Sequence, residues 1–266
     1  PTALADFFTG QEGASLNVPA PGVLANDTAG GVGLTAALVD GPANGTLTLN
    51  ADGSFAYTPT NNFTGVDGFT YQAISGTLTS AVATVTIMIA PSGEFIYDTF
   101  SRPANTDSIF PWVQQLGDWS ITNNALVGAS SPNNYGYAYF DDNANWTNFS
   151  VQAQFQLSST TAWGGGVGGR LDPITGAHYA AWIYPEGSPG GPQNGTSILQ
   201  LFKFQTWTTY SNMIGSPVVL PALGTGAHIL KMTFQTNNIT VYFDGAQITN
   251  VTDTGFIRCS IVCGWE

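Results

Sequence analysis

The chain has 266 residues, only 8% of them charged, and a formal net charge of −12. Its five basic residues are Arg102, Arg170, Lys203, Lys231 and Arg258. Nucleic acids and anionic membrane surfaces are bound through clustered Lys and Arg, so this composition argues against both as partners. The sequence also has no run that approaches the ~18 apolar residues of a membrane span.

The first part of the chain, to about residue 90, shows apolar residues at alternate positions and no helical periodicity. Asp52-Gly53, between Leu49 and Phe55, predicts a type I′ hairpin, whose two central residues both have positive φ. Six or seven short strands at this spacing predict a β-sandwich. The expected strands are residues 16–18, 34–39, 46–49, 55–57, 69–73 and 81–89.

Short motifs rich in Gly and Asn follow one another along residues 1–90. They are PGVL at 21–24, Asn26-Asp27, GTL at 45–47, GSF at 53–55 and GVDGF at 65–69. In this order they resemble the cadherin-like, Ig-fold repeats of large bacterial surface proteins. The resemblance implies an Ig-like sandwich that occurs in tandem and acts as a spacer.

The acidic residues of this part have no salt-bridge partner nearby, because residues 1–101 contain no Lys or Arg. Their carboxylates are therefore solvated, accept hydrogen bonds or bind a cation, and Ca²⁺ prefers such hard oxygen ligands. Asp27 and Asp67, which belong to two of the motifs above, are the candidate calcium ligands.

A change of pattern follows Ala90, where a Pro-Ser-Gly turn precedes a new apolar alternation at residues 95–100. We predict a domain at residues 1–90, a linker at 91–94 and a second domain at 95–266. A linker this short leaves little freedom, so we expect the two domains to behave as a semi-rigid pair.

The second part is again a series of strands, the clearest being a meander over residues 228–248 with turns at Asn237-Asn238 and Asp244-Gly245. Its opening (97–128), its ITVYFDG hairpin (239–245) and its last strand resemble the concanavalin-like, laminin-G-like jelly rolls. The resemblance implies two large antiparallel sheets whose concave face often holds sugars. The expected strands are residues 95–100, 119–122, 125–127, 137–140, 149–157, 164–171, 179–184, 199–203, 226–235, 238–243 and 257–263.

Catalytic patterns are missing from the sequence. Glycoside hydrolysis needs two carboxylates flanking the scissile bond, and glucanases of this fold carry two Glu and an Asp at alternate positions of one strand. No Glu-X-Asp-X-Glu segment exists here, and the chain has only four glutamates. His178 and His228 have no nucleophile or metal ligand at useful spacing, which indicates structural histidines. We predict a protein that is not an enzyme.

Aromatic residues in or beside predicted loops are candidates for carbohydrate binding, since aromatic faces stack on pyranose rings. They are Trp163, Trp182, Tyr184 and Trp207, with Tyr210 nearby. Residues 178–197 form a long Gly- and Pro-rich stretch typical of a binding rim. Core packing is the alternative, because Trp182 alternates with Ala180 and Tyr184 along a predicted strand.

Sequons for N-linked glycosylation are frequent. A sequon in a loop accepts a glycan only in a secreted protein, so their number favours an extracellular glycoprotein; the alternative is that composition alone produces them. The asparagines concerned are Asn26, Asn44, Asn62, Asn145, Asn148, Asn194, Asn238 and Asn250.

The two cysteines, Cys259 and Cys263, lie four residues apart on a predicted strand. Their Cα atoms would then be about 13 Å apart, whereas a disulfide needs roughly 4.4–6.8 Å. They are expected to be buried thiols or to pair with another chain, not with each other.

Together these features predict an extracellular, non-catalytic structural or adhesive glycoprotein, either a segment of a surface protein or the subunit of a fibre. Its partners would be neighbouring repeats or copies of itself, joined end to end or by strand addition. The alternative is a lectin-like carbohydrate-binding module that binds glycans; a glycoside hydrolase is a third hypothesis.

Overall fold

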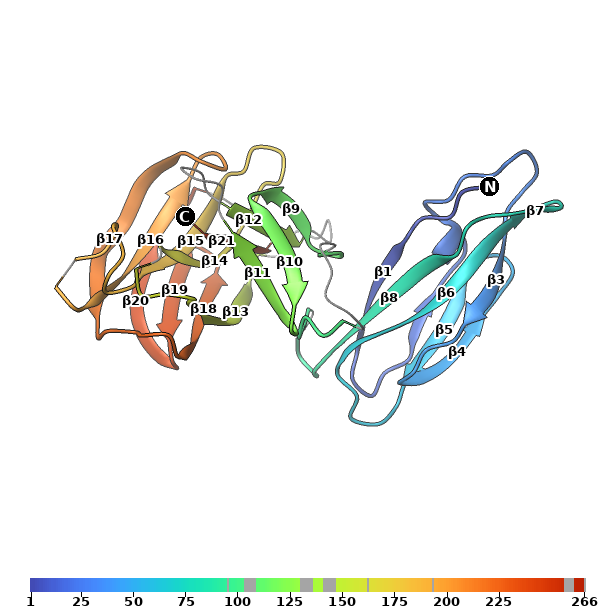
Figure 1. Cartoon of the computed structure of the whole chain (residues 1–266), viewed down its shortest axis with the longest axis horizontal. Coiled ribbons are helices and arrows are strands. Elements are labelled where there is room, and N and C mark those ends of the chain that lie inside the picture. Colours follow the sequence, from blue (N-terminus) through green and yellow to red (C-terminus); the bar gives the residue numbers. More distant parts are fainter. Residues whose placement is uncertain are drawn as a thin grey trace. The chain divides into compact units, whose positions relative to one another are not determined.

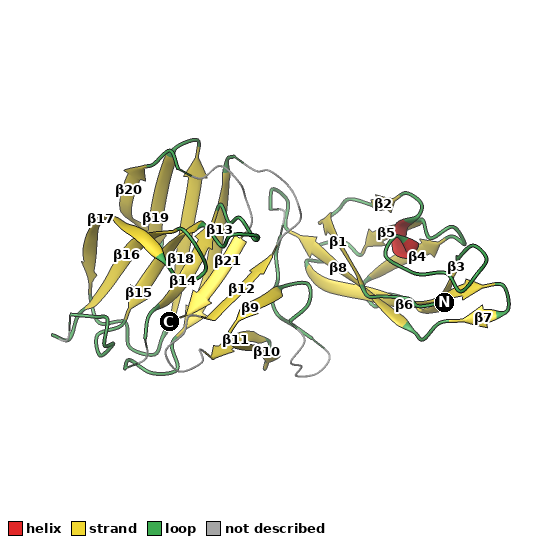
Figure 2. Cartoon of the chain, turned by 90° about the horizontal axis from the view of Figure 1, so that it is seen from above, coloured by secondary structure: helices red, strands yellow, loops and turns green. Residues whose placement is uncertain are grey.

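The computed structural model describes residues 1–94, 96–102, 109–129, 136–140, 147–161, 163–192, 194–255 and 261–265. Within these ranges the regular elements are strands, apart from one 3₁₀ helix, η1 (Gly22–Leu24) (Figure 2). The all-β fold class is confirmed. The chain forms two compact units, Pro1–Asn105 with Ile121–Ala125 and Thr106–Ser120 with Leu126–Glu266 (Figure 1). The domain boundaries expected at residues 90 and 95 stay predictions.

The first unit is an Ig-like sandwich of two sheets. A five-stranded sheet has the order β1-β8-β6-β3, with β7 also paired to β6, and a three-stranded sheet has the order β2-β5-β4. β1 runs parallel to β8, and the other pairs are antiparallel. The strands are β1 (Asp6–Gln11), β2 (Leu16–Val18), β3 (Thr35–Asp40), β4 (Gly45–Leu49), β5 (Phe55–Pro59), β6 (Gly65–Ser75), β7 (Leu78–Thr79) and β8 (Ala83–Ala90).

The core of this unit follows from strict alternation along β6, where every second residue from Gly65 to Ser75 is buried. Phe69 and Tyr71 face Phe55 and Tyr57 across the sandwich, and all four side chains are at most 3% exposed. The Phe55 ring makes an edge contact with Phe69, with 5.4 Å between centroids. These aromatic side chains therefore join the two sheets.

The hairpin predicted between residues 49 and 55 is present, but its turn differs from the expectation. Gly53 has φ +84°, whereas Asp52 does not have positive φ. The turn is longer than a two-residue loop and is closed by a hydrogen bond from Asn50 N to Ser54 O at 2.9 Å. The Asp52 carboxylate accepts bonds from the backbone N–H and the hydroxyl of Ser54, which stabilises the longer turn.

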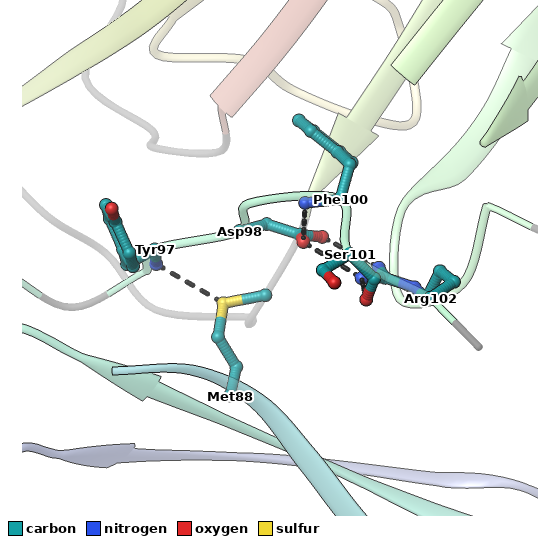
Figure 3. A network of polar contacts seen from close by, with 6 residues as sticks. All are labelled: Met88, Tyr97, Asp98, Phe100, Ser101 and Arg102. Carbon is teal, nitrogen blue, oxygen red and sulfur yellow. Dashed lines mark hydrogen bonds and ion pairs between the residues drawn. The ribbon is translucent and has the colours of Figure 1, made fainter. Parts of the chain in front are cut away.

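The segment after β8 was predicted as a strand at residues 95–100, and this is wrong for 96–100, which have no regular structure. Asp98 organises it (Figure 3): both carboxylate oxygens pair with the Arg102 guanidinium, at 3.0 and 2.9 Å, and Oδ1 also accepts the Phe100 N–H at 2.7 Å. Phe100 has φ +53°, which a strand does not allow. The Tyr97 N–H donates to the Met88 sulfur at 3.3 Å, so the segment covers the outer side of β8.

The second unit is a jelly-roll-type sandwich of a seven-stranded sheet, β17-β16-β15-β14-β21-β12-β9, and a four-stranded sheet, β13-β18-β19-β20. β10 (Asp118–Thr122) and β11 (Ala125–Ala129) form a separate two-stranded sheet, whose residues are divided between the two units. The other strands are β9 (Val113–Leu116), β12 (Gly136–Phe140), β13 (Phe149–Gln156), β14 (Gly165–Gly169), β15 (His178–Tyr184), β16 (Ser197–Phe204), β17 (Tyr210–Leu220), β18 (Ala227–Gln235), β19 (Asn238–Phe243), β20 (Ala246–Thr252) and β21 (Ile261–Trp265).

The main core of this unit lies between the two sheets. Tyr179 and Ile183 of β15 face Leu230, Met232 and Phe234 of β18 there, and each of these side chains is at most 1% exposed. The predicted meander is present as β18, β19 and β20, and its Asp244-Gly245 turn has positive φ at both residues, as a type I′ turn requires.

His178 is fully buried on the other face of the seven-stranded sheet, where its ring stacks on Phe204 with 4.5 Å between centroids. Its Nδ1 lies 2.8 Å from the Gly176 carbonyl oxygen. Burial lowers the pKa of His178 to about 4, although the bond to Gly176 acts in the opposite direction. The folded protein therefore holds a neutral imidazole at this position.

Acid should destabilise the second unit through His178. Its unfolded pKa is near 6.5, so its contribution is complete above that pH and decreases as the pH falls towards 4. We expect a loss of about 2 kcal/mol in the free energy of unfolding between pH 6.5 and pH 5. Urea unfolding followed by tryptophan fluorescence measures it, since all seven tryptophans follow residue 105.

The control is His178→Phe, which keeps a ring against Phe204 but cannot titrate. His228 is present in both proteins, and its effect cancels in the comparison. Desolvation lowers the pKa of His228, but hydrogen bonds from its ring to Asp244 and Leu223 outweigh this and raise it. An equal acid-induced loss in His178→Phe would contradict the assignment.

Asp98→Ala should loosen the segment 96–102, because it removes the partner of a guanidinium that is 11% exposed and the acceptor of the Phe100 N–H. We expect amide exchange in this segment to accelerate by a factor of about 10 to 100, equivalent to about 1–3 kcal/mol. Asp98→Asn keeps an acceptor for the Phe100 N–H, so its exchange rate in this segment should lie between those of the unsubstituted protein and Asp98→Ala. Hydrogen–deuterium exchange measures this rate in the three proteins. An unchanged rate in Asp98→Ala would show that Asp98 does not hold the segment in place.

Candidate functional site

The seven-stranded sheet carries a second apolar layer on the face turned away from the main core. Side chains alternate along a strand, so Ala180, Trp182 and Tyr184 of β15 point opposite to Tyr179 and Ile183. They pack in a separate cluster with side chains from β12 and β16 and with Leu171. The buried members besides those of β15 are Tyr137, Leu171, Phe202 and Phe204.

A cavity of about 250 Å³ opens on this aromatic face. Its buried lining comes from Tyr184 of β15 and from Gln200 and Phe202 of β16, which are 8%, 2% and 5% exposed. Its exposed lining includes Trp163 and Tyr210, at 47% and 46%. Ile198, Met213, Pro217 and Gly190 complete it. We call these nine residues the aromatic pocket.

Strand register brings these side chains together. Ile198, Gln200 and Phe202 alternate along β16 and so share one face. In the neighbouring strands Tyr184 pairs with Ile198, and Met213 of β17 pairs with Phe202. The pocket is therefore built on the strands β15, β16 and β17, with Trp163 and Gly190 added from loops.

Two glycines let loop backbone approach the Tyr184 ring. A Cβ atom on Gly190 would lie 2.6 Å from this ring and one on Gly164 would lie 2.7 Å from it. Real side chains do not fit at such distances, so any other residue would displace the loop or the ring. Gly164 and Gly190 thus shape the pocket wall around Tyr184.

Gln200 is the one residue among the nine that carries a side-chain amide. Its Nε2 donates to the Leu201 carbonyl at 3.0 Å, whereas its Oε1 is buried and accepts no hydrogen bond from any described residue. Leaving a buried acceptor unsatisfied costs about 1–3 kcal/mol. Gln200 is a lining residue of the cavity, so a ligand or water there can supply the missing donor once the amide turns towards it.

The predicted carbohydrate-binding residues have different positions. Trp163 and Tyr184 line the aromatic pocket. Trp182 is 1% exposed and lies 6.0 Å from Phe204 between ring centroids, a position that favours the core-packing alternative for this residue. Trp207 is half-buried and packs on Tyr137 and Tyr139, at 5.5 and 5.4 Å, outside the pocket lining.

Sequence reasoning missed Gln200, Met213 and Pro217 as pocket residues. β17 was not predicted, because Gly215 and Pro217 interrupt its alternation. β17 is an edge strand, where Pro is tolerated because one row of N–H groups needs no partner. Nothing in the sequence distinguishes Gln200 from an ordinary strand glutamine; only its burial does.

The glutamate nearest to the pocket in sequence, Glu186, has a structural role. Its carboxylate accepts the backbone N–H groups of Leu223 and Gly224, at 3.0 and 3.1 Å, and the Ser197 hydroxyl. Desolvation raises the pKa of Glu186, but these hydrogen bonds outweigh it and lower the pKa. Glu186 holds the loop after β15 to the sandwich, and none of the nine described residues that line the pocket carries a carboxylate.

The two candidate calcium ligands accept hydrogen bonds in the first unit. Asp67 accepts the N–H groups of Ala43 and Asn44, at 3.0 and 2.8 Å, and the Tyr57 hydroxyl at 2.7 Å. Asp27 accepts the Leu4 N–H and the Tyr71 hydroxyl, both at 2.9 Å. A cluster of three or more His, Cys, Asp or Glu residues that could hold a metal ion does not occur within the described ranges.

The sequon asparagines lie mostly at the surface. Asn44 is half-buried, and Asn145 lies outside the described residues. The other six are exposed: Asn26, Asn62, Asn148, Asn194, Asn238 and Asn250. Their glycosylation stays a prediction that intact mass spectrometry tests.

The cysteines stay a prediction as well. Cys259 lies outside the described residues, and Cys263 is described only by the pairing of its backbone in β21 with Val167 and Ala138. As regards a membrane, the described part of the chain contains no helix long and apolar enough to cross one.

Solved structures similar to the chain share little sequence with it. A carbohydrate-binding module, CBM66, from Bacillus subtilis is 15% identical, with a TM-score of 0.45 over 58% of this chain and 90% of that one. The catalytic domain of an endo-1,3-β-glucanase (laminarinase) from Thermotoga petrophila RKU-1 is 9% identical, with a TM-score of 0.43 over 65% and 85%. A Bacillus subtilis protein of unknown function with a galectin-like fold is 11% identical, with a TM-score of 0.39 over 61% and 89%.

These likenesses are too distant to bear on function. No curated protein matches the chain. A family model does match its first part: residues 1–88 are similar to the bacterial Ig domain, in agreement with the Ig-like sandwich observed there.

Proposed function

We propose that the second unit binds a neutral carbohydrate in the aromatic pocket. The observation that carries this proposal is the buried Oε1 of Gln200, without a donor among the described residues, in a pocket where four of the other eight lining residues are aromatic. Sugars present both groups that such a site needs: apolar C–H faces that stack on rings, and hydroxyl groups that donate hydrogen bonds.

The size and charge of the pocket restrict the ligand. About 250 Å³ is less than the ~300–1,000 Å³ of pockets for drug-sized ligands, which suits one sugar residue, at a chain end or as a branch. None of the nine lining residues is charged, so sulfated or uronic acid sugars would lose their hydration without gaining a partner. The proposed ligand is therefore a neutral sugar with a hydroxyl group directed at Gln200.

The proposed activity is binding without cleavage. Hydrolysis of a glycosidic bond needs two carboxylates beside it, and the pocket supplies none. Bacterial Ig domains are typical of extracellular proteins, and the first unit matches one. A glycan-binding unit joined to an Ig-like unit supports an extracellular adhesive role, with a glycan as the partner. Self-association into fibres, by strand addition or end to end, stays a prediction without support from the pocket.

Trp163→Ala should weaken sugar binding at least about tenfold, equivalent to about 1.4 kcal/mol, because it removes the most exposed ring of the pocket. A glycan array with neutral, sulfated and uronic acid glycans identifies the ligand, and calorimetric titration with it gives the affinity. Ile174→Ala, an 84% exposed apolar residue outside the pocket, is the control and should bind normally. Absence of neutral-glycan binding, or unchanged binding in Trp163→Ala, would overturn the proposal.

Gln200→Leu should separate binding from stability. The substitution removes the unsatisfied Oε1 together with one weak local hydrogen bond, so we expect the melting temperature to stay constant or to rise. Sugar binding should fall strongly, since the ligand hydroxyl then loses its acceptor. Thermal unfolding and calorimetric titration measure the two effects, and a binding constant equal to that of the unsubstituted protein would exclude Gln200 from the site.

A further inference from the structure

A second site emerges at the start of β1 in the first unit, where oxygen atoms outnumber the hydrogen atoms available to them. The Tyr71 hydroxyl lies 2.6 Å from the Val23 carbonyl oxygen, 2.9 Å from Asp27 Oδ2 and 3.4 Å from the Leu4 carbonyl oxygen. A hydroxyl group has one hydrogen and can satisfy one of these three acceptors at a time. The other two acceptors receive no hydrogen from Tyr71 at that moment.

Asp6, the first residue of β1, adds a further acceptor to this cluster. It is 7% exposed, and its Oδ2 is buried and receives no hydrogen bond from the described part of the chain. The Tyr71 hydroxyl and the Asn26 amide are its polar neighbours, and the Asp27 carboxylate is close enough to repel it. The Asn26 amide also serves another acceptor, the Ala5 carbonyl, at 3.1 Å.

Asp67, another buried carboxylate of the first unit, has enough hydrogen-bond donors, in contrast to Asp6 and Asp27. Asp67 is also buried, at 8% exposed, but both of its carboxylate oxygens accept hydrogen bonds. The donors are the backbone N–H groups of Ala43 and Asn44 and the Tyr57 hydroxyl. At Asp6 and Asp27 the donors are fewer than the acceptors. Lys and Arg cannot correct the deficit, because residues 1–101 contain neither.

We propose that Asp6 and Asp27 form a divalent cation site, with Ca²⁺ as the best fit, and that the carbonyl oxygens of Leu4 and Val23 contribute to it. Ca²⁺ binds six to eight oxygen ligands, accepts backbone carbonyls and tolerates irregular geometry, whereas Mg²⁺ requires a near-ideal octahedron. Two carboxylates also match the charge of the ion. The inference extends the sequence prediction at Asp27, assigns Asp6 as its partner and leaves Asp67 a structural residue.

The position of the proposed site determines how an ion reaches it and which elements the ion would connect. Leu4 is half-exposed and Asp27 is partly exposed, so an ion can reach the cluster from solvent. The proposed ligands come from the start of β1, from η1 and from the turn after it. β1 is the edge strand of its sheet and pairs only with β8 there, so the ion would tie this strand to η1 and the turn that follows it.

The test uses the full chain with CaCl₂ as the probe and MgCl₂ as a comparison. Differential scanning calorimetry should show that about 10 mM Ca²⁺ raises the melting temperature of the first unit by roughly 5 °C, as expected for a millimolar site, and that Mg²⁺ raises it less. Hydrogen–deuterium exchange should show slower exchange in peptides that cover residues 1–11 and 22–28.

Three matched variants locate the effect. Asp6→Asn and Asp27→Asn should abolish the Ca²⁺-induced shift, and Asp6→Asn should melt no lower than the unsubstituted protein without Ca²⁺, because it removes an uncompensated buried charge. Asp67→Asn should melt lower but keep the full shift. The proposal is overturned if Ca²⁺ produces no shift, if the shift survives in Asp6→Asn, or if it disappears in Asp67→Asn.

Discussion

The second unit depends on one constraint. The strands β15 and β16 are apolar on both faces, so the side chains on both faces of the seven-stranded sheet must be shielded from water. The four-stranded sheet covers one face, and its contacts form the main core. On the other face the sheet's own aromatic side chains pack against one another, and loop glycines approach them at Tyr184. The aromatic pocket is the place where this cover is incomplete, and its position on the sheet follows from that.

The first unit works under a different constraint, which is the absence of Lys and Arg from residues 1–101 of its sequence; its one arginine, Arg102, pairs with Asp98. Buried carboxylates in such a domain need neutral donors, and Asp67 finds them in backbone N–H groups and in the Tyr57 hydroxyl. Tyrosine therefore has two roles here, since Tyr57 and Tyr71 fill the core with their rings and serve carboxylates with their hydroxyl groups. Desolvation is the main cause that raises the pKa of both hydroxyls well above the usual value, and the nearby carboxylates raise it further. Both tyrosines therefore remain protonated donors.

Local pattern was sufficient to predict most strands, because alternation and turn residues are properties of neighbouring positions. β2 and β5 begin where they were expected, and the class of both sandwiches was correct. Features that depend on contacts between residues far apart in the sequence could not be predicted from local pattern. β1 was missed although it pairs with β8, and residues 96–100 were predicted as a strand although Asp98 bends them. The same limit applies to the site: the aromatic character of Trp163 and Tyr184 was visible, but the burial of Trp182 and the unsatisfied Gln200 result from packing.

Pro217 has a consequence beyond its place in the aromatic pocket. It lies in β17, an edge strand of the seven-stranded sheet, and cannot donate a backbone hydrogen bond. Together with Gly215, at φ +76°, and the irregular pairing with β16 between Leu199 and Leu201, it breaks the regular row of groups that an incoming strand would need. The edge beside the pocket is thereby protected against the stacking of copies, and a crowded surface could display many such units without their sheets fusing.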